Sequence, residues 1–355
     1  ENDGAIQDGA AISIVNRTGY KGLDKIEVTG GTFKANGTNA AIKAYGWANK
    51  TESDFDNSNG TIAITGGTFS SKVDLAYCAP NHEPTANDDG TYTVAKFYEA
   101  RIGAVEYETL QKAFDAVTTE GQQTIVLLHD VTVTETLKFD KTYNDIPTIL
   151  KMQGFTITGD GCRALQIVNG HLRIEGRSNE DPESIITSTG IGIASSVIRV
   201  GAEGAVADSK QNLSLAMGVT VKTDCSYGIT VFGGGTEILS VENSKVISTA
   251  KHNADYDGCA IATLGTDNTT ASVTIKSGAV IEAKDSNAIY MPSGSLLVYG
   301  NVGNYPTVTG LTGIYAKSGR VTIKGANIYG TGVAQGYIYN GNGGVPTGDA
   351  LVIDN

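Results

Sequence analysis

Alternating apolar and polar positions recur along the chain in short runs, and one phrase shows the pattern clearly. "AIYMPSG" at 288–294 returns as "GIYAKSG" at 313–319 and as "YIYNGNG" at 337–343. A period of two residues is typical of β-strands that bury one face. We therefore expect Ile289 to face a core and Tyr290 to point away from it.

The aligned positions form two series along the later part of the chain. The first series advances by 32, 28, 25 and 24 residues through Ile229, Ile261, Ile289, Ile314 and Ile338. The second series runs through Leu213, Leu239, Val273, Leu297, Val321 and Leu351. Two strands per unit, at a period of 24 to 34 residues, predict a solenoid whose stacked units share one core. Wide coils with polar turns favour an all-β fold, a right-handed parallel β-helix.

The first hundred residues repeat in their own way. "IEVTGGTF" at 26–33 returns as "IAITGGTF" at 62–69, and "AISIV" at 11–15 is matched by "AIKAY" at 41–45. These pairs indicate further coils of the same kind, which the segment "NDDGTYTV" at 87–94 is expected to close.

The segment 100–133 breaks the strand pattern. Apolar residues recur there at helical spacing, with Thr109 as a candidate N-cap and Gly121 as a stop: Leu110, Ala113, Phe114 and Val117. A short capping helix near 108–118 would close the open end of the coil that follows. We therefore predict two domains. Residues 1–96 are the C-terminal coils of a first β-helix unit, and residues 97–355 are a second unit with its own capping helix.

The amino-acid composition supports an all-β chain and limits the classes of partner that we expect. Gly is abundant at 45 of 355 residues, Pro is scarce at 7, and the net charge is −12. An acidic chain repels phosphate backbones, so nucleic acid is not expected as a partner. No apolar run approaches the roughly 18 residues that span a bilayer, so membrane insertion is not expected either. The opening "ENDGAIQDGA" has no basic start and no apolar stretch, so we expect a segment of a longer modular chain.

Residues 60–135 carry a resemblance to a known family. "ITGGTFSSKVDLAYCAP" and "NDDGTYTV" are similar to a unit that recurs in large secreted or wall-attached proteins of gut Gram-positive bacteria. "ARIGAVEYETLQKAFDAV", followed by "TIVLLHDVTV", resembles the opening of their next unit. The rest of the chain resembles the pectin-lyase-like β-helix in a general way. The resemblance implies an extracellular location, secreted or attached to the cell wall. It implies no reaction, because that superfamily holds lyases, hydrolases, adhesins and inert stalks.

The acidic residues do not form a recognisable catalytic set. The NTD, DD, GHG and RIK motifs of pectin-degrading β-helix enzymes are absent as a set, and the pair Asp88–Asp89 lies in the turn "NDDGTY". Asp255 and Asp257 lie in "NADYDGC", a loop that lengthens its coil. Their spacing suits Ca²⁺, with a plain turn as the alternative, and no other cofactor is expected.

The repeated phrase itself supplies the main candidate for binding. Tyr290, Tyr315 and Tyr339 occupy one outward position on three successive coils, which stack about 4.8 Å apart. A row of exposed rings, extended by Arg199, suits stacking on sugar rings or anchoring a protein partner. The alternative is that the rings only stabilise neighbouring strands.

Two of the four cysteines precede strands of the first series. Cys225 and Cys259 lie 34 residues apart. In oxidising surroundings they are expected to bridge neighbouring coils, and otherwise to remain two half-buried thiols.

These observations favour a non-catalytic cell-surface β-helix module that binds a polysaccharide, host glycan or host protein, or spaces other modules. The alternative is a polysaccharide lyase or glycoside hydrolase acting on an acidic plant or host polysaccharide, with Asp255 and Asp257 as its carboxylates. The two differ in geometry, because an enzyme needs acids that converge in one groove.

Overall fold

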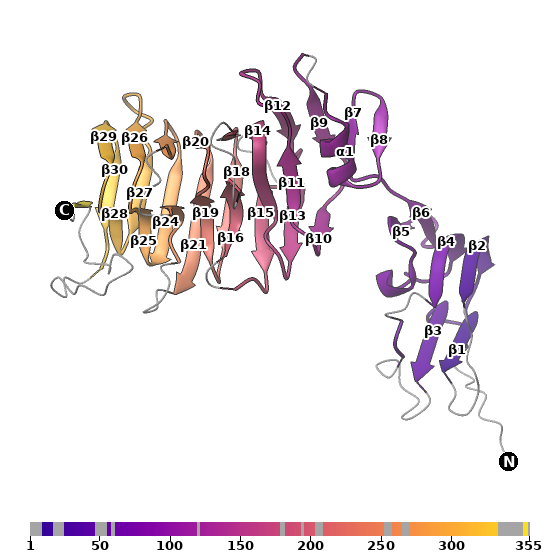
Figure 1. Cartoon of the computed structure of the whole chain (residues 1–355). Helices are drawn as coiled ribbons and strands as arrows, with labels where there is room; N and C mark the ends of the chain where they lie inside the picture. The colour runs from indigo at the N-terminus through magenta and orange to yellow at the C-terminus, as the bar shows by residue number, and fades with distance from the viewer. Residues whose placement is uncertain are drawn as a thin grey trace. The chain divides into compact units, whose positions relative to one another are not determined.

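The structure is a computed structural model that describes residues 9–16, 25–46, 55–57, 61–118, 121–177, 182–192, 195–202, 209–251, 258–264, 270–332 and 351–353. It separates into two compact units, unit 1 (Glu1–Tyr98) and unit 2 (Glu99–Asn355). This division falls two residues after the boundary predicted between 96 and 97. Both units consist mainly of strands (Figure 1).

Unit 1 stacks its repeats as parallel strands. β1 (Ile12–Asn16) pairs with β3 (Ile42–Gly46), and β2 (Ile26–Phe33) pairs with β4 (Ile62–Phe69). In both pairs the repeated isoleucines lie opposite one another, so the repeats stack in the predicted register.

Unit 1 ends in antiparallel strands. A short 3₁₀ helix, η2 (Leu75–Tyr77), precedes the hairpin of β5 (His82–Ala86) and β6 (Tyr92–Lys96), and β6 also pairs with β4. The change from parallel to antiparallel pairing ends the stack of coils at the segment 87–94.

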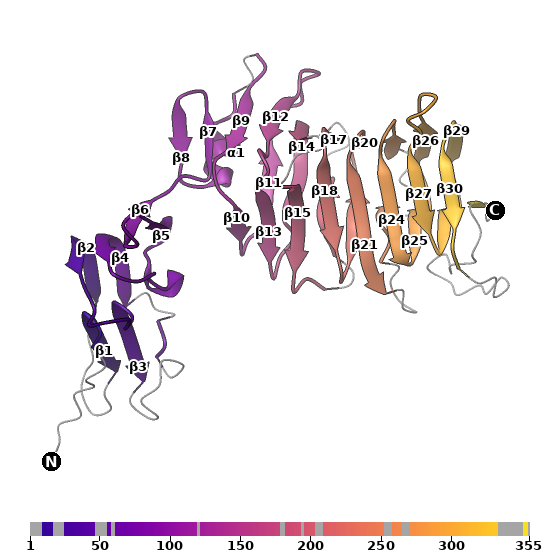
Figure 2. The same ribbon diagram turned by 180° about the vertical axis from the view of Figure 1, so that it is seen from behind.

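Unit 2 stacks parallel strands in three ladders, seen from two sides in Figures 1 and 2. Ladder 1 is an eight-stranded sheet of β10 (Val131–Val133), β13 (Thr156–Asp160), β15 (Ser184–Thr189), β18 (Val219–Thr223), β21 (Lys245–Lys251), β24 (Val280–Asp285), β27 (Thr307–Gly310) and β30 (Asn327–Gly330). Ladder 2 contains β11 (Leu137–Asp140), β14 (Leu165–Glu175), β16 (Ser196–Val200), β19 (Tyr227–Val231), β22 (Ile261–Thr263), β25 (Asn287–Met291), β28 (Thr312–Ala316) and β31 (Leu351–Ile353). Ladder 3 contains β9 (Thr124–Leu127), β12 (Thr148–Lys151), the second half of β14, β17 (Lys210–Ala216), β20 (Thr236–Val241), β23 (Ser272–Ile275), β26 (Ser295–Tyr299) and β29 (Arg320–Lys324).

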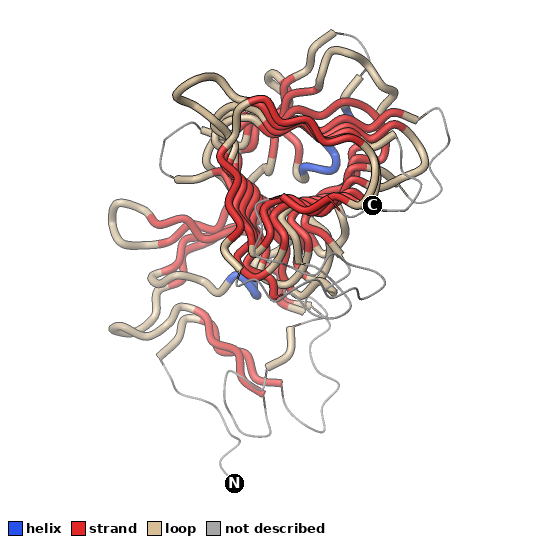
Figure 3. Tube along the Cα trace, turned by 90° about the vertical axis from the view of Figure 1, so that its left-hand side faces the viewer, coloured by secondary structure: helices blue, strands red, loops and turns tan. Residues whose placement is uncertain are grey.

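The long strand β14 belongs to ladders 2 and 3 and joins them into one sheet. In the end-on view of Figure 3, strands of successive coils overlie one another. Stacked parallel strands of this kind are compatible with the predicted parallel β-helix.

Unit 2 begins with antiparallel strands and a helix. β7 (Ala100–Ile102) pairs with β8 (Val105–Tyr107) and with β9, both antiparallel. The helix α1 (Leu110–Ala116) lies within the predicted range and has Thr109 as its N-cap, but it ends before Gly121. Among the described residues, no helix has the length and apolar character needed to cross a membrane.

One apolar core runs through unit 2, and the predicted alternation holds where the repeated phrase forms β25. Ile289 and Met291 are fully buried in this core, whereas Tyr290 belongs to a separate cluster outside it. Each coil therefore buries the apolar face of its neighbours, as a solenoid requires.

Two details of the predicted repeat are wrong. The sequence indicated two strands per unit, whereas each complete coil has three, because the strands of ladder 1 were not predicted. In ladder 3 the core position next to Val273 is Leu296, and Leu297 pairs with Thr274 on the other face. A slip of one residue reverses the face of every side chain in a strand.

The last member of the second series is also misplaced. Leu351 pairs with Ile314, a member of the first series, and so extends ladder 2. Ile338, which the sequence assigned to that position, lies outside the described residues.

Candidate functional site

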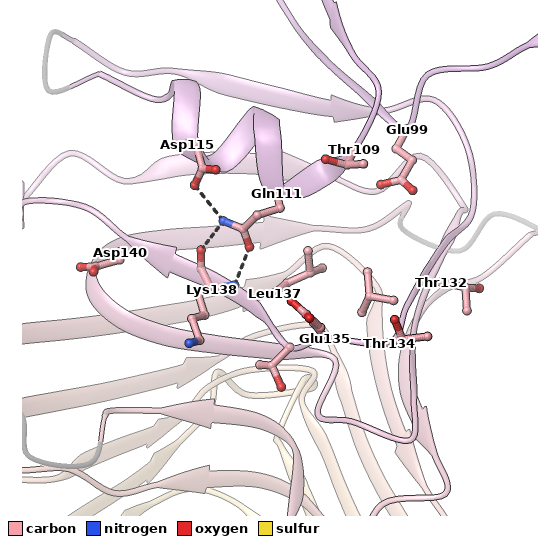
Figure 4. A pocket seen from close by; sticks show the side chains of 12 residues that line it. Glu99, Thr109, Gln111, Asp115, Thr132, Thr134, Glu135, Leu137, Lys138 and Asp140 are labelled. Carbon is pink, nitrogen blue, oxygen red and sulfur yellow. Dashed lines mark hydrogen bonds between the residues drawn. The ribbon is translucent and has the colours of Figure 1, made fainter. Parts of the chain in front are cut away.

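A pocket of unit 2 lies beside α1 and has a volume of about 620 Å³ (Figure 4). The helix contributes Gln111 and Asp115, the segment 132–138 forms the opposite wall, and Glu99 and Asp140 complete the lining. Figure 4 shows Glu99 beside Thr109 at one end of the pocket and Asp140 at the other. Four of the polar side chains here form hydrogen bonds with α1 or within it: Glu99, Thr109, Gln111 and Asp115.

The start of α1 is held by two acceptors. The Thr109 hydroxyl accepts a hydrogen bond from the Lys112 N–H (3.2 Å), as an N-cap does. A carboxylate oxygen of Glu99 accepts a second bond from the Leu110 N–H (2.7 Å). Both bonds satisfy N–H groups that lack a partner within the helix.

Gln111 ties the helix to the first strand of ladder 2. Its side-chain amide donates to the Lys138 carbonyl (3.0 Å) and accepts from the Lys138 N–H (2.8 Å). The same amide also donates to the Asp115 carboxylate (2.9 Å). At the other end of α1, the Lys141 ammonium donates to the Asp115 carbonyl (2.7 Å), where a cation also favours the helix dipole.

Beneath these bonds, α1 presents an apolar face to the core. Leu110, Ala113 and Phe114 are buried, and the Phe114 ring meets that of Phe139 edge to face at 5.5 Å. A helix of seven residues has little stability of its own, so these contacts determine that it forms.

Burial perturbs the carboxyl group of Glu99 at the wall of this pocket. Burial raises the pKa of its carboxyl, and the hydrogen bond from Leu110 and the nearby His129 oppose that shift. A raised pKa at the wall of a pocket is a property of catalytic acids. The Glu99 carboxylate, however, already accepts the hydrogen bond of the Leu110 N–H at the start of α1 (2.7 Å). The geometry therefore favours anchoring of α1 over catalysis.

The titration of Glu99 gives a testable pH dependence. Because its pKa is higher in the folded state than in the unfolded state, stability falls as the pH rises from the ordinary glutamate pKa through the raised value. Glu99→Gln removes this titration and keeps an oxygen that accepts from Leu110. The stability of Glu99→Gln relative to wild type should therefore increase across this pH window, measured by urea unfolding at several pH values. A difference in stability between Glu99→Gln and wild type that stays flat across these pH values would contradict the prediction.

Sequence reasoning missed Glu99 and Gln111. Glu99 lies eleven residues before its partner, and Gln111 lies 27 residues before Lys138, so neither contact leaves a local spacing signal. The helix itself was detectable because its apolar residues and its N-cap lie within one short window.

The tyrosine series is in register, but its predicted exposure is wrong for the two members that the structure describes. Tyr290 lies opposite Tyr315, and Ala262 precedes them in the same row. Their exposed fractions are only 5% and 2%. The two rings lie 6.1 Å apart and pack in a cluster with Tyr227, Cys259 and Ala262. A side chain can point away from the core and still be buried by its neighbours on the outer face.

Arg199 occupies the same row, between Gln166 and Thr230, and is also buried. Its guanidinium lies 4.9 Å from the centre of the Phe232 ring, and its Nε donates to the Phe232 carbonyl (3.3 Å). Burial raises the pKa of the nearby Glu237, and the charge of Arg199 partly offsets this. Arg199 thus stabilises a turn and a buried acid, which is not the exposed position predicted from the sequence.

Tyr339, Asp255 and Asp257 lie outside the described residues, so the Ca²⁺ site stays a prediction. Within the described ranges, no three His, Cys, Asp or Glu side chains are placed to hold a metal ion. The Asp89 carboxylate accepts from the Thr91 N–H and hydroxyl, which lowers its pKa and marks a turn.

Of the two alternatives for Cys225 and Cys259, the structure has the unbridged one. Neither cysteine forms a disulfide; Cys225 is half-buried and Cys259 is fully buried. The register of Ile229 with Ile261 sets Cys259 opposite Tyr227, two residues beyond Cys225. The offset explains why the pair is not bridged.

Comparison with known protein families, with curated proteins and with solved structures finds no match to this chain.

Proposed function

We propose that this chain is a non-catalytic structural module of a larger extracellular protein, in which it spaces other modules. Unit 2 is then a right-handed parallel β-helix closed at its first coil by α1. The extracellular location rests on the resemblance of residues 60–135 to modular bacterial surface proteins.

The observation that carries this proposal is the use of the polar groups around α1. Hydrogen bonds with the backbone of the helix and of Lys138 occupy the side chains of Glu99, Thr109 and Gln111. The helix side of the pocket therefore lacks the free, convergent polar groups that a substrate pocket would keep. A capped first coil and a continuous core suit a rigid spacer.

A binding role for Tyr290 and Tyr315 has less support from the structure than the spacer role. Tyr290 and Tyr315 contact one another and their neighbours, so their faces are occupied within the protein. A sugar ring stacks only on an aromatic face that it can reach.

The test is a panel of acidic and neutral polysaccharides, with two readouts on the same samples. Neither new reducing ends nor the ultraviolet absorbance of unsaturated uronates should appear, and no polysaccharide should bind on an array. Turnover that Glu99→Gln abolishes would overturn the proposal in favour of a lyase or hydrolase. Binding that Tyr290→Ala and Tyr315→Ala abolish without loss of folding would replace the spacer with a recognition module.

A further inference from the structure

The loop 141–147, which joins β11 to β12, packs against side chains of the two following coils. The Tyr143 ring lies almost parallel to the His171 imidazole, with an angle of 4° and 6.1 Å between the ring centres. The Lys210 ammonium lies 4.3 Å from the centre of the same Tyr143 ring. Because His171 belongs to β14 and Lys210 to β17, Tyr143 joins the loop to both strands.

The same loop holds the end of α1. Its first residue, Lys141, donates from its ammonium to the Asp115 carbonyl in the last turn of the helix (2.7 Å). A cavity of about 20 Å³, room for roughly one water molecule, is enclosed by residues after the helix, residues of the loop and one strand residue: Val117, Thr118, Gly121, Phe139, Lys141, Thr142, Asn144, Ile146, Thr148 and His171. A displacement of the loop would therefore disturb the end of α1.

Two buried polar atoms beside the loop have no hydrogen-bond partner within the described part of the chain. They are Nδ1 of His171 and Oδ1 of Asn212. His171 lies directly opposite Asn212 in the register of β14 with β17, and neighbouring strands are about 4.8 Å apart. A proton on His171 Nδ1 thus has no acceptor while the ring is stacked on Tyr143. It can reach Asn212 Oδ1 if the imidazole turns toward β17.

The charges around His171 oppose a further positive charge. The charged side chains come from three elements: Arg173 and Glu175 from β14, Lys141 and Asp145 from the loop, and Lys210 from β17. Arg173 and Glu175 are paired with one another (Nε to Oε1, 2.8 Å). This leaves two lysines against Asp145, so the imidazolium would add to an excess of positive charge.

The neutral imidazole is therefore the form that fits the folded loop. Burial lowers the pKa of His171 from its ordinary value of 6.5, and Arg173 adds to this shift. The backbone of Asn144 and Asp145 and the Asp145 carboxylate oppose it. Because the pKa is lower in the folded state, the stabilisation by His171 is complete above pH 6.5 and is lost as the pH falls through the lowered value.

We propose that His171 is a pH-sensitive latch, which holds the loop 141–147 and the end of α1 in its neutral form and releases them when it is protonated. The protonated ring turns from Tyr143 toward Asn212, where its Nδ1–H finds an acceptor, and the turn breaks the stack that holds the loop. Acidification then uncovers the first coil of unit 2. This device acts whether or not the module is a spacer.

The test is hydrogen exchange of the whole chain by mass spectrometry at about pH 7.5 and about pH 5, with each rate divided by that of an unstructured peptide at the same pH. Protection of the loop 141–147 should fall about fivefold or more at the lower pH, whereas β19 and β25 should stay protected. The loop is the main readout, because the titration of Glu99 stabilises the start of α1 in the opposite direction. Proton resonances of the Tyr143 ring should also change at the same pH midpoint as those of His171.

His171→Phe keeps an aromatic ring beside Tyr143 but has no nitrogen to protonate. Its loop should be equally protected at both pH values. The matched control is His82→Phe in β5 of unit 1, which should lose protection of the loop on acidification as the wild type does. A wild-type loop with the same protection at both pH values would overturn the inference. So would a His171→Phe loop that loses as much protection as the wild type, or a Tyr143 ring that does not follow the titration of His171.

Discussion

Phe114→Ala is expected to lower the free energy of unfolding of unit 2 by about 3–5 kcal/mol. The ring is fully buried, and it fills the space between α1 and Phe139 at the first coil. The loss includes the transfer of the ring out of the core and the cavity left behind. Because α1 has only seven residues, the substitution should also loosen the helix and expose the first coil. Urea unfolding followed by far-ultraviolet circular dichroism measures the change.

Tyr329→Ala is the matched control for this experiment. Tyr329 is also an aromatic residue of unit 2, but it is 52% exposed on the last coil, so its loss should cost no more than about 0.5 kcal/mol. If the two substitutions cost the same, α1 does not contribute to the core and the account of a closed first coil is wrong.

Gly319→Ala is expected to cost about 3 kcal/mol or more. Gly319 ends the phrase "GIYAKSG" and has a backbone φ of +93°, a conformation that side chains disfavour. A Cβ at this position would overlap the carbonyl oxygen of Gly294, which ends the same phrase one coil earlier and also has a φ of +93°. That oxygen accepts the Arg320 N–H (3.0 Å), so the overlap would also displace a bond between coils.

Gly303→Ala separates the cost of the unfavourable backbone φ from the cost of the overlap between coils. Gly303 has a similar φ of +85°, but nothing lies within 4 Å of the position that a Cβ would take. It should therefore cost only the backbone term of about 1–2 kcal/mol. Equal costs for the two substitutions, again measured by urea unfolding, would show that the glycines of the repeated phrase are not needed for close stacking of the coils.

The core positions of the phrase repeated at 288–294 and 313–319 could be predicted from the sequence alone. Its alternation identified Ile289 and Ile314 as stacked core positions, because a period of two is visible within one strand and recurs in the next. Gly319 follows Gly294 one coil later because the turns of these two coils touch.

The errors have physical causes that local sequence does not show. "LLV" at 296–298 has two adjacent leucines, so the pattern fits either face, and only pairing with β23 selects Leu296 for the core. Tyr290 and Tyr315 point outward as predicted, but burial on the outer face depends on neighbours such as Cys259, which is distant in sequence. Glu99 was missed for the same reason, since its role depends on a helix that begins eleven residues later.

Hydrogen exchange of the intact wild type, read by mass spectrometry, tests most directly the central claim that unit 2 is closed at its first coil and open at its last. Amides of α1 and β11 should be strongly protected, close to those of interior strands such as β19 and β25. Amides of β29 and β30 should exchange much faster, because the described part of the chain places no further strand beside them and Ile323 of β29 is 39% exposed. Exchange of α1 and β11 as fast as that of β29 and β30 would contradict the account, because the first coil would then be as open as the last.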